Sequence, residues 1–182
     1  MTMTGSTLET GTAPPVPHAR DASAGEDAQA NWLTPEQQVH WRAYLLGTAR
    51  LSEALTRQLE ADAGLSLSEY EILVRLSEAP ERTVRMSELA DSLVHSRSRL
   101  THTVSRMEKR GLVRRVSCEV DARGVNCVMT HEGFALLASA APGHVTAVRA
   151  NLLDLLTEEQ FTVLGEVMAA VVRGPAGGVT TA

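Results

Sequence analysis

A short helix, a brief turn and a second helix follow one another near the middle of the chain, and this order constrains the fold more than any other feature. Residues 86–93 favour the short helix and residues 94–95 the turn. Ser96 caps the second helix, which should run to Arg110 before Gly111 ends it, because glycine readily adopts the left-handed conformation that closes a helix. The order predicts a helix-turn-helix unit.

Two runs of β-favouring residues follow that unit, over 112–117 and 125–129. Between them, residues 121–124 (Asp-Ala-Arg-Gly) have the composition of a turn, so the two runs should form a hairpin. A helix-turn-helix unit followed by a hairpin is the winged helix-turn-helix arrangement, in which the second helix enters the major groove of DNA. The sequence therefore predicts a mainly α fold with a small β-hairpin wing (α+β).

Capping residues predict further helices on both sides of this unit. These helices begin at serine or threonine residues that can accept a hydrogen bond from the first turn, namely Thr34, Ser66, Thr130 and Thr157. The helix after Thr34 should run to about Ala61. The helix after Thr130 must bend or break at Pro142-Gly143, because proline lacks the amide hydrogen that a helix interior needs.

The two ends of the chain differ from this body in composition. Residues 1–31 are rich in Thr, Ala, Gly and Pro without a hydrophobic period, which predicts a disordered arm, and residues 173–182 should form a flexible tail. Between them we expect a single domain over 32–172, with the winged helix-turn-helix at about 66–130. No stretch approaches the ~20 apolar residues of a membrane span. Because a signal-peptide pattern is also missing, the expected location is the cytoplasm, with no membrane partner.

The charge of the chain is unevenly distributed. The formal net charge is −5, which by itself argues against a nucleic-acid partner. Residues 95–115, however, hold seven cations and one acid, Glu108, so this stretch carries +6 and the rest of the chain −11. A block polarised in this way has the electrostatic character of a DNA-binding element. From charge alone, an ordinary solvated basic face is an equal alternative.

The two sides of the basic helix differ in chemistry. Leu100, Val104 and Met107 share one side at helical spacing, which predicts that this side packs on the core. The opposite side carries hydrogen-bond donors, of which arginine suits the acceptors of guanine and hydroxyls suit phosphates. In the hairpin, Arg123 is placed to enter the minor groove, and Asp121 to orient it. The candidate DNA-binding residues are Ser96, Arg97, Ser98, Arg99, Thr101, His102, Ser105, Arg106, Lys109, Arg115, Asp121 and Arg123.

These residues resemble the MarR family of bacterial regulators. The likeness runs from about Thr34 to Val172. Its motifs are specific together, although neither the helix motif nor the wing motif is specific alone. They read Ser96-Arg97-Ser98-Arg99-Leu100-Thr101, Arg106-Met107-Glu108-Lys109-Arg110-Gly111-Leu112-Val113, Asp121-Ala122-Arg123-Gly124 and Met129-Thr130-His131-Glu132-Gly133.

The resemblance implies a homodimer, formed by the first helix and the last two helices at about 34–61 and 131–172, on a pseudo-palindromic, inverted-repeat operator. It implies that the helix after Ser96 lies in the major groove, that Arg123 lies in the minor groove, and that Arg106 and Asp121 brace or contact the DNA backbone. Many relatives release DNA when a small, often aromatic, effector binds between the dimer helices and the DNA-binding lobe. Peroxide-sensing relatives carry a cysteine early in the first helix, which this chain lacks, so peroxide sensing is not expected.

The sequence therefore predicts a sequence-specific, double-stranded-DNA-binding transcriptional regulator. A repressor is favoured over an activator, because repression needs only that a bound dimer blocks polymerase. The alternative is a winged-helix protein-interaction module without DNA binding, which would have little reason to keep its basic face free of acids. We expect no enzyme and no cofactor, since the sequence has no phosphate-binding glycine loop, nucleophile elbow or recognisable carboxylate pair. No close-spaced histidine motif predicts a metal site.

Two pairs of residues leave more than one interpretation open. Cys118 and Cys127 flank the wing turn and would lie opposite each other if the turn were centred on residues 122–123, which would permit a redox-switched wing. Two ordinary thiols are the alternative. Trp41 and Tyr44 on the first helix either line an effector pocket or pack in the core or at a dimer interface.

Overall fold

The computed structural model describes residues 31–93, 96–118 and 124–174. In chain order, the elements are α1 (Pro35–Ala63), α2 (Leu67–Glu78), η1 (Pro80–Arg82), β1 (Thr83–Arg85), α3 (Met86–Ser92), α4 (Arg97–Lys109), β2 (Val113–Ser117), β3 (Val125–Met129), α5 (His131–Asn151), η2 (Leu153–Leu155) and α6 (Glu158–Arg173). The order of helices and hairpin matches the prediction, and the fold is the expected mainly helical one with a small antiparallel sheet.

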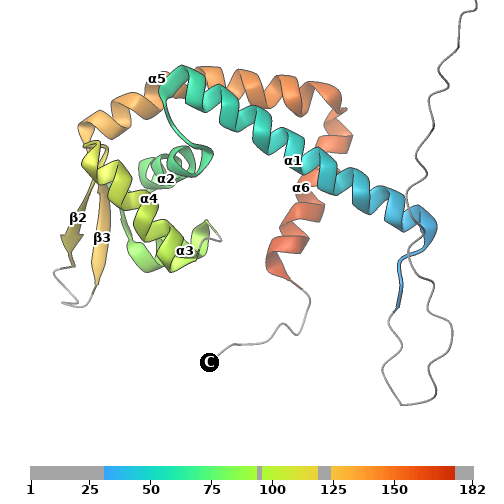
Figure 1. Ribbon diagram of the computed structural model, residues 1–182, viewed down its shortest axis with the longest axis horizontal. Coiled ribbons are helices and arrows are strands. Elements are labelled where there is room, and N and C mark those ends of the chain that lie inside the picture. The colour runs from blue at the N-terminus through green and yellow to red at the C-terminus, as the bar shows by residue number, and fades with distance from the viewer. Residues whose placement is uncertain (1–30, 94–95, 119–123, 175–182) are drawn as a thin grey trace, which may run out of the picture.

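Figure 1 shows two parts of different build. The elements from α2 to β3, here called the winged lobe, gather beneath one end of a pair of long helices, α1 and α5, which lie side by side. Helix α6 descends from the far end of α5, on the side away from the hairpin. Helices α1, α5 and α6 are called the outer helices below. No helix among the described residues is long and apolar enough to cross a membrane.

The helix boundaries follow the predicted caps closely. Thr34, Ser66 and Thr157 each form a complete capping box, in which the side chain at the third helical position bonds back to the amide of the capping residue. The hydroxyls of Ser96 and Thr130 accept a hydrogen bond from the first turn of α4 and α5, respectively. These local rules therefore decide where five of the helices begin.

Two features of the secondary structure depart from the expectation. The sheet has three strands in the order β1-β3-β2, and β1 was not predicted because three residues are too few to show an alternating pattern. Helix α5 continues through Pro142 without interruption and arches over the winged lobe. Of the two outcomes expected at Pro142, the break is therefore wrong, since a curved helix can absorb the missing hydrogen bond.

The core of the molecule lies in the winged lobe. Leu100, Val104 and Met107 of α4 are buried, as their spacing predicted, and they join a cluster built mainly from α2, α3 and the sheet. Leu59 is the one buried side chain of α1, and α6 buries none. Most of the apolar burial that stabilises one chain therefore comes from the lobe that carries α4.

Candidate nucleic-acid interface

Helix α4 exposes the side that the sequence assigned to DNA. Eight of the candidate residues are exposed on this helix or at its cap, and Ser105 is half-buried. The exposed ones are Ser96, Arg97, Ser98, Arg99, Thr101, His102, Arg106 and Lys109. The positive ends of the peptide dipoles at the start of α4 add to the attraction that these cations exert on phosphates.

A hollow of about 620 Å³ opens between the start of α2 and the exposed side of α4. Its lining consists only of hydroxyl, imidazole and guanidinium side chains, with no acid and no apolar residue. The lining residues are Ser66, Ser68, Ser96, Ser98, Arg99, His102, Thr103 and Arg106. Such a surface suits a phosphodiester, which offers only acceptors. Sequence reasoning missed Ser66 and Ser68 as part of this surface, although the capping box had already placed Ser66 at the start of α2.

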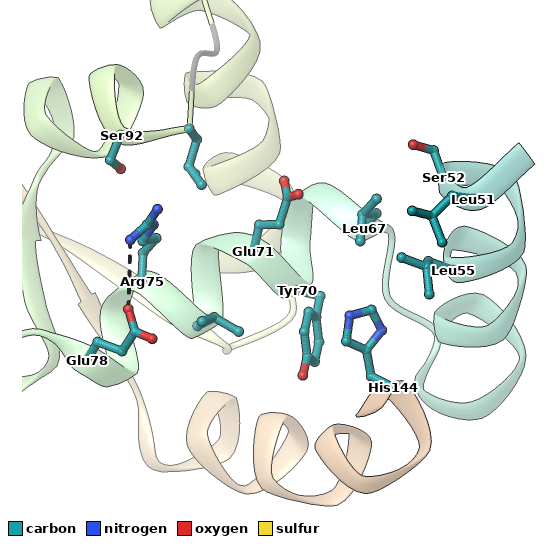
Figure 2. A pocket seen from close by; sticks show the side chains of 12 residues that line it. Leu51, Ser52, Leu55, Leu67, Tyr70, Glu71, Arg75, Glu78, Ser92 and His144 are labelled. Carbon is teal, nitrogen blue, oxygen red and sulfur yellow. Dashed lines mark ion pairs between the residues drawn. The ribbon is translucent and has the colours of Figure 1, made fainter. Parts of the chain in front are cut away.

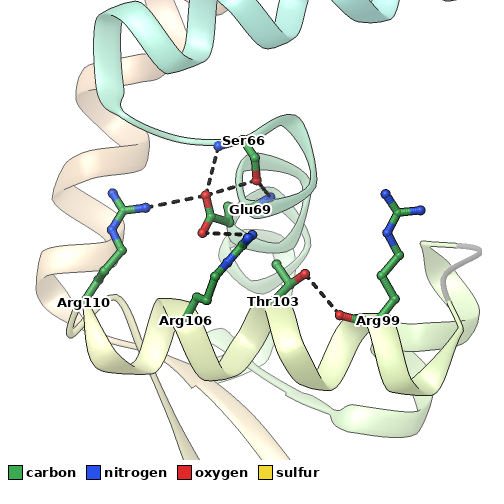
Figure 3. A network of polar contacts seen from close by, with 6 residues as sticks. All are labelled: Ser66, Glu69, Arg99, Thr103, Arg106 and Arg110. Carbon is green, nitrogen blue, oxygen red and sulfur yellow. Dashed lines mark hydrogen bonds and ion pairs between the residues drawn. The ribbon is translucent and has the colours of Figure 1, made fainter.

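A buried carboxylate ties α4 to α2 beside this hollow (Figure 3). Glu69 is only 5% exposed, and its Oε2 accepts hydrogen bonds from the Ser66 amide at 2.9 Å and the Ser66 hydroxyl at 3.0 Å. Arg106 Nη2 lies 3.6 Å from Glu69 Oε1, and Arg110 Nη1 lies 3.5 Å from Oε2. Glu69 was not a predicted site residue, because its place in the capping box of α2 already explained an acidic residue at this position.

The lone acid of the basic stretch has a structural partner. Glu108 accepts hydrogen bonds from Arg115 Nη2 at 2.7 Å, from Arg115 Nε at 3.0 Å and from the Arg115 amide at 3.0 Å. These hydrogen bonds lower the pKa of Glu108. The pair fastens β2 to α4, so the Arg115 guanidinium is already engaged in the free protein. Its contact with DNA stays a prediction.

The hypothesis of a redox-switched wing required Cys118 and Cys127 to lie opposite each other, and the strand register contradicts this. In the β2–β3 pairing, Arg115 lies opposite Cys127, and the Cys118 amide donates to the Gly124 carbonyl at 2.9 Å. Cys118 and Cys127 are therefore not opposite each other, because the strands are offset from the turn centre that we assumed. Cys127 belongs to the core, and burial raises its pKa to about 12. The other wing candidates, Asp121 and Arg123, lie outside the described residues.

A second hollow, of about 650 Å³, lies where α1, α2, α3 and α5 meet (Figure 2). Leucine and valine side chains form much of its wall, together with Tyr70, Arg75, Glu78 and His144. The Tyr70 and His144 rings are in contact, with their centroids 4.3 Å apart. Burial raises the pKa of Tyr70 and lowers that of His144, so both rings are neutral near pH 7.

The imidazole of His144 connects this pocket to α1. His144 Nδ1 lies 3.2 Å from Gln58 Oε1, and Gln58 Nε2 donates to Asp62 Oδ2 at 2.9 Å. Because an amide oxygen can only accept, this contact is a hydrogen bond in the tautomer that carries the imidazole proton on Nδ1. No group of three metal-ligating side chains occurs in the described parts of the chain.

Trp41 and Tyr44 lie neither in this pocket nor in the core. Their rings stack on each other, with centroids 5.6 Å apart, on a part of α1 where both side chains are exposed. Other large apolar side chains of the outer helices are exposed as well, among them Leu46, Val145, Phe161, Val167 and Val171. A single chain thus leaves an apolar surface on the outer helices. Core packing of Trp41 and Tyr44 is therefore wrong, whereas a dimer interface and an effector pocket both stay predictions for them.

A basic helix presented by a capped helix-turn-helix, with a three-stranded wing beside it, defines the class of winged helix-turn-helix transcriptional regulators. The model of the MarR family matches residues 63–124 of this chain. The HTH-type transcriptional regulator PecS of Dickeya dadantii (strain 3937) is 33% identical over 133 residues, which cover 70% of this chain and 79% of PecS. The chain belongs to the MarR family, whose members are regulators of transcription and not enzymes.

Two solved structures of relatives from Streptomyces coelicolor agree with this membership. The MarR family regulator Sco3205, crystallised in complex with DNA, is 45% identical and superposes with a TM-score of 0.79, over 82% of this chain and 95% of that one. The MarR family regulator AbsC is 40% identical with a TM-score of 0.75, over 80% of this chain and 100% of that one. The resemblance seen in the sequence motifs is therefore confirmed.

Proposed function

We propose that this protein is a homodimeric repressor that binds a pseudo-palindromic operator, with α4 of each subunit in the major groove. The observation that carries the proposal is the exposed side of α4 together with the hollow beside it, because both offer donors and cations and neither offers an acid. An interaction module for another protein would have no need of such a surface, so we favour DNA as the partner. The complex of Sco3205 with DNA supports the same choice.

The side chains of α4 divide into two roles under this proposal. Arg99 and His102 lie on the exposed side, where they can reach base edges and read the sequence. Arg106 lies further along, near the C-terminal end of α4, where it meets the backbone, although all three side chains line the hollow. The wing adds Arg123 in the minor groove, oriented by Asp121.

A dimer follows from the outer helices. Helix α6 has no buried residue in one chain, although Phe161, Val167 and Val171 give it an apolar side. A helix of this kind is stable only when another surface covers it. A second copy covers it by two-fold symmetry, and the two α4 helices then read half-sites about 34 Å apart, one helical turn of DNA.

The hollow beside Tyr70 and His144 is our candidate for the site of a small effector. Its volume of about 650 Å³ lies in the range of small-molecule sites, and its wall combines apolar side chains with Arg75, Tyr70 and His144. An aromatic ligand could pack on the leucines and hydrogen-bond to these three groups. Because the hollow lies between the outer helices and α2, its occupant would act on the angle between the dimer helices and the winged lobe.

The test is to incubate the purified protein with sheared genomic DNA from its own source and to sequence the retained fragments. The control is the double variant Arg106→Ala/Arg123→Ala, which keeps the apolar side of α4. We expect enrichment of a few inverted repeats by the wild-type protein and none by the variant. Transcripts beside those repeats should rise when the gene is deleted. Absence of enrichment would favour a winged-helix protein-interaction module, and capture of protein partners would then follow.

A further inference from the structure

Glu69 is the only buried carboxylate among the residues that the structure describes, and the cost of burying it needs an explanation. Capping α2 does not explain its charge. The capping boxes of α1 and α6 use Gln37 and Gln160 at the same position, and each glutamine forms both reciprocal hydrogen bonds. An amide therefore suffices to cap a helix in this protein. A buried carboxylate is more costly to desolvate than an amide, so the charge of Glu69 must serve another interaction.

That interaction is with α4. The two oxygens of Glu69 face two guanidinium groups of α4 and its C-terminal cap, Arg106 at 3.6 Å and Arg110 at 3.5 Å (Figure 3). The two arginines differ in exposure: 63% of the Arg106 side chain is exposed, against 38% for Arg110. Arg106 also lines the hollow between α2 and α4, whereas Arg110 does not. One arginine therefore serves mainly to balance the buried charge, and the other extends from it toward solvent.

We propose that Glu69 is a positioning residue for DNA binding, which holds the Arg106 guanidinium at the hollow so that its remaining N–H groups meet a backbone phosphate. A guanidinium has five donors in a rigid plane, so it can pair with a carboxylate on one edge and a phosphate on another. Holding it in advance removes the entropy cost of ordering a long side chain when DNA binds. This inference rests on the proposed function, in which the exposed side of α4 binds DNA.

The test compares the salt dependence of DNA binding in Glu69→Gln with that of the wild type. Glutamine keeps the capping hydrogen bond and removes only the charge. The probe is a random-sequence DNA duplex, because a phosphate contact is independent of sequence, and binding is followed by fluorescence anisotropy at several KCl concentrations. We expect weaker binding, although the variant is more positively charged. The slope of log K against log[KCl] should become shallower by about one unit per subunit, the signature of one lost phosphate contact.

Two further variants separate positioning from a general effect on charge or folding. Glu60→Gln removes the same charge from an exposed position of α1 and should leave the slope unchanged. The double variant Glu69→Gln/Arg106→Ala should have the slope of Arg106→Ala alone, because both changes remove the same contact. If Glu69→Gln fails to fold, as judged by its thermal melt, Arg106→Lys replaces it, since a single ammonium cannot bridge carboxylate and phosphate in the same plane.

The outcomes are distinct. A wild-type slope in Glu69→Gln, or tighter binding, would overturn the proposal, because Glu69 would then be a cap only or a competitor of DNA for Arg106. A further loss of slope in the double variant would also overturn it. If the wild-type protein itself shows no salt-dependent binding to the duplex, the proposed function fails, and this result is separate from a failure of the Glu69 proposal.

Discussion

The winged lobe and the outer helices are built from similar aliphatic residues, yet they use them differently. In the winged lobe, side chains such as Leu73, Leu89 and Met107 are fully buried within one chain. On the outer helices, Leu46, Phe161 and Val167 are exposed, and α6 buries no residue. The core of the winged lobe is thus closed within one chain, with Leu59 of α1 and Leu137 of α5 contributing to it, whereas much of the apolar surface of the outer helices stays uncovered.

Under the proposed function, this difference explains how one small chain can serve a two-fold operator. The lobe that carries α4 needs a fixed internal structure, since groove contacts require side chains held within a fraction of an ångström. The outer helices need a surface that is complementary to itself, because a two-fold dimer uses the same patch on both subunits. Apolar residues therefore stabilise the fold in one region and, under the proposed function, stabilise the assembly in the other.

The largest expected effect on DNA binding comes from placing charges on the exposed apolar side of α6. Phe161→Asp/Val167→Asp places two carboxylates on the apolar side of α6, where pairing with a second copy would bury them. We expect monomers in sedimentation equilibrium. Loss of the second half-site contact should weaken operator binding by about 100- to 10,000-fold. Thr162→Asp, an exposed position on the opposite side of α6, is the control and should remain dimeric. A dimeric double variant would place the interface elsewhere.

The core of the winged lobe gives the next largest effect. Leu73→Ala removes a fully buried side chain of α2 and should lower the free energy of unfolding by about 2–5 kcal/mol. Measured by urea unfolding in the monomeric Phe161→Asp/Val167→Asp background, Val171→Ala should cost almost nothing, because that side chain is exposed in one chain. Equal costs for the two alanine variants would show that α6 is packed within the monomer, against the distinction drawn above.

Within the winged lobe, base contacts should give smaller and more selective effects. Arg99→Ala or His102→Ala should each weaken binding to the preferred operator by about 1–3 kcal/mol if the side chain touches a base, with little change on random DNA. Arg106→Ala should weaken binding to every sequence alike. The ratio of operator to random-DNA affinity, measured by anisotropy, separates the two groups. A ratio changed by Arg106→Ala and untouched by Arg99→Ala would reverse the roles we assign.

The same contrast separates what the sequence could predict from what it could not. Helix starts, the buried side of α4 and the wing were predictable, because capping and periodicity are local and the winged lobe satisfies them within one chain. Strand β1 escaped prediction because three residues carry no periodicity. The fold at Pro142 depended on how far a long helix can curve, which tertiary contacts decide.

The candidate site was predictable in part for a related reason. Exposed donors on α4 follow from helical geometry, so most predicted side chains are indeed exposed. The pairing of Glu69 with Arg106 and Arg110 joins α2 to α4 and has no local signal. The predicted pairing of Cys118 with Cys127 was wrong for a similar reason. The register of β2 and β3 depends on which residues of β3 face the core, and Cys127 is one of them.

The smallest expected effect lies at the seam between the two regions, where His144 of α5 contacts Tyr70 of α2 and Gln58 of α1. Burial holds the pKa of His144 below 6.5, so the unfolded chain binds more protons than the folded one as the pH falls past that value. Stability should therefore be fully present above pH 6.5 and decline as the pH falls toward the folded pKa. His144→Gln cannot titrate, so it should remove this part of the decline in thermal melts between pH 7 and pH 5. A variant that keeps the whole decline would show that the seam is insensitive to the charge of this imidazole.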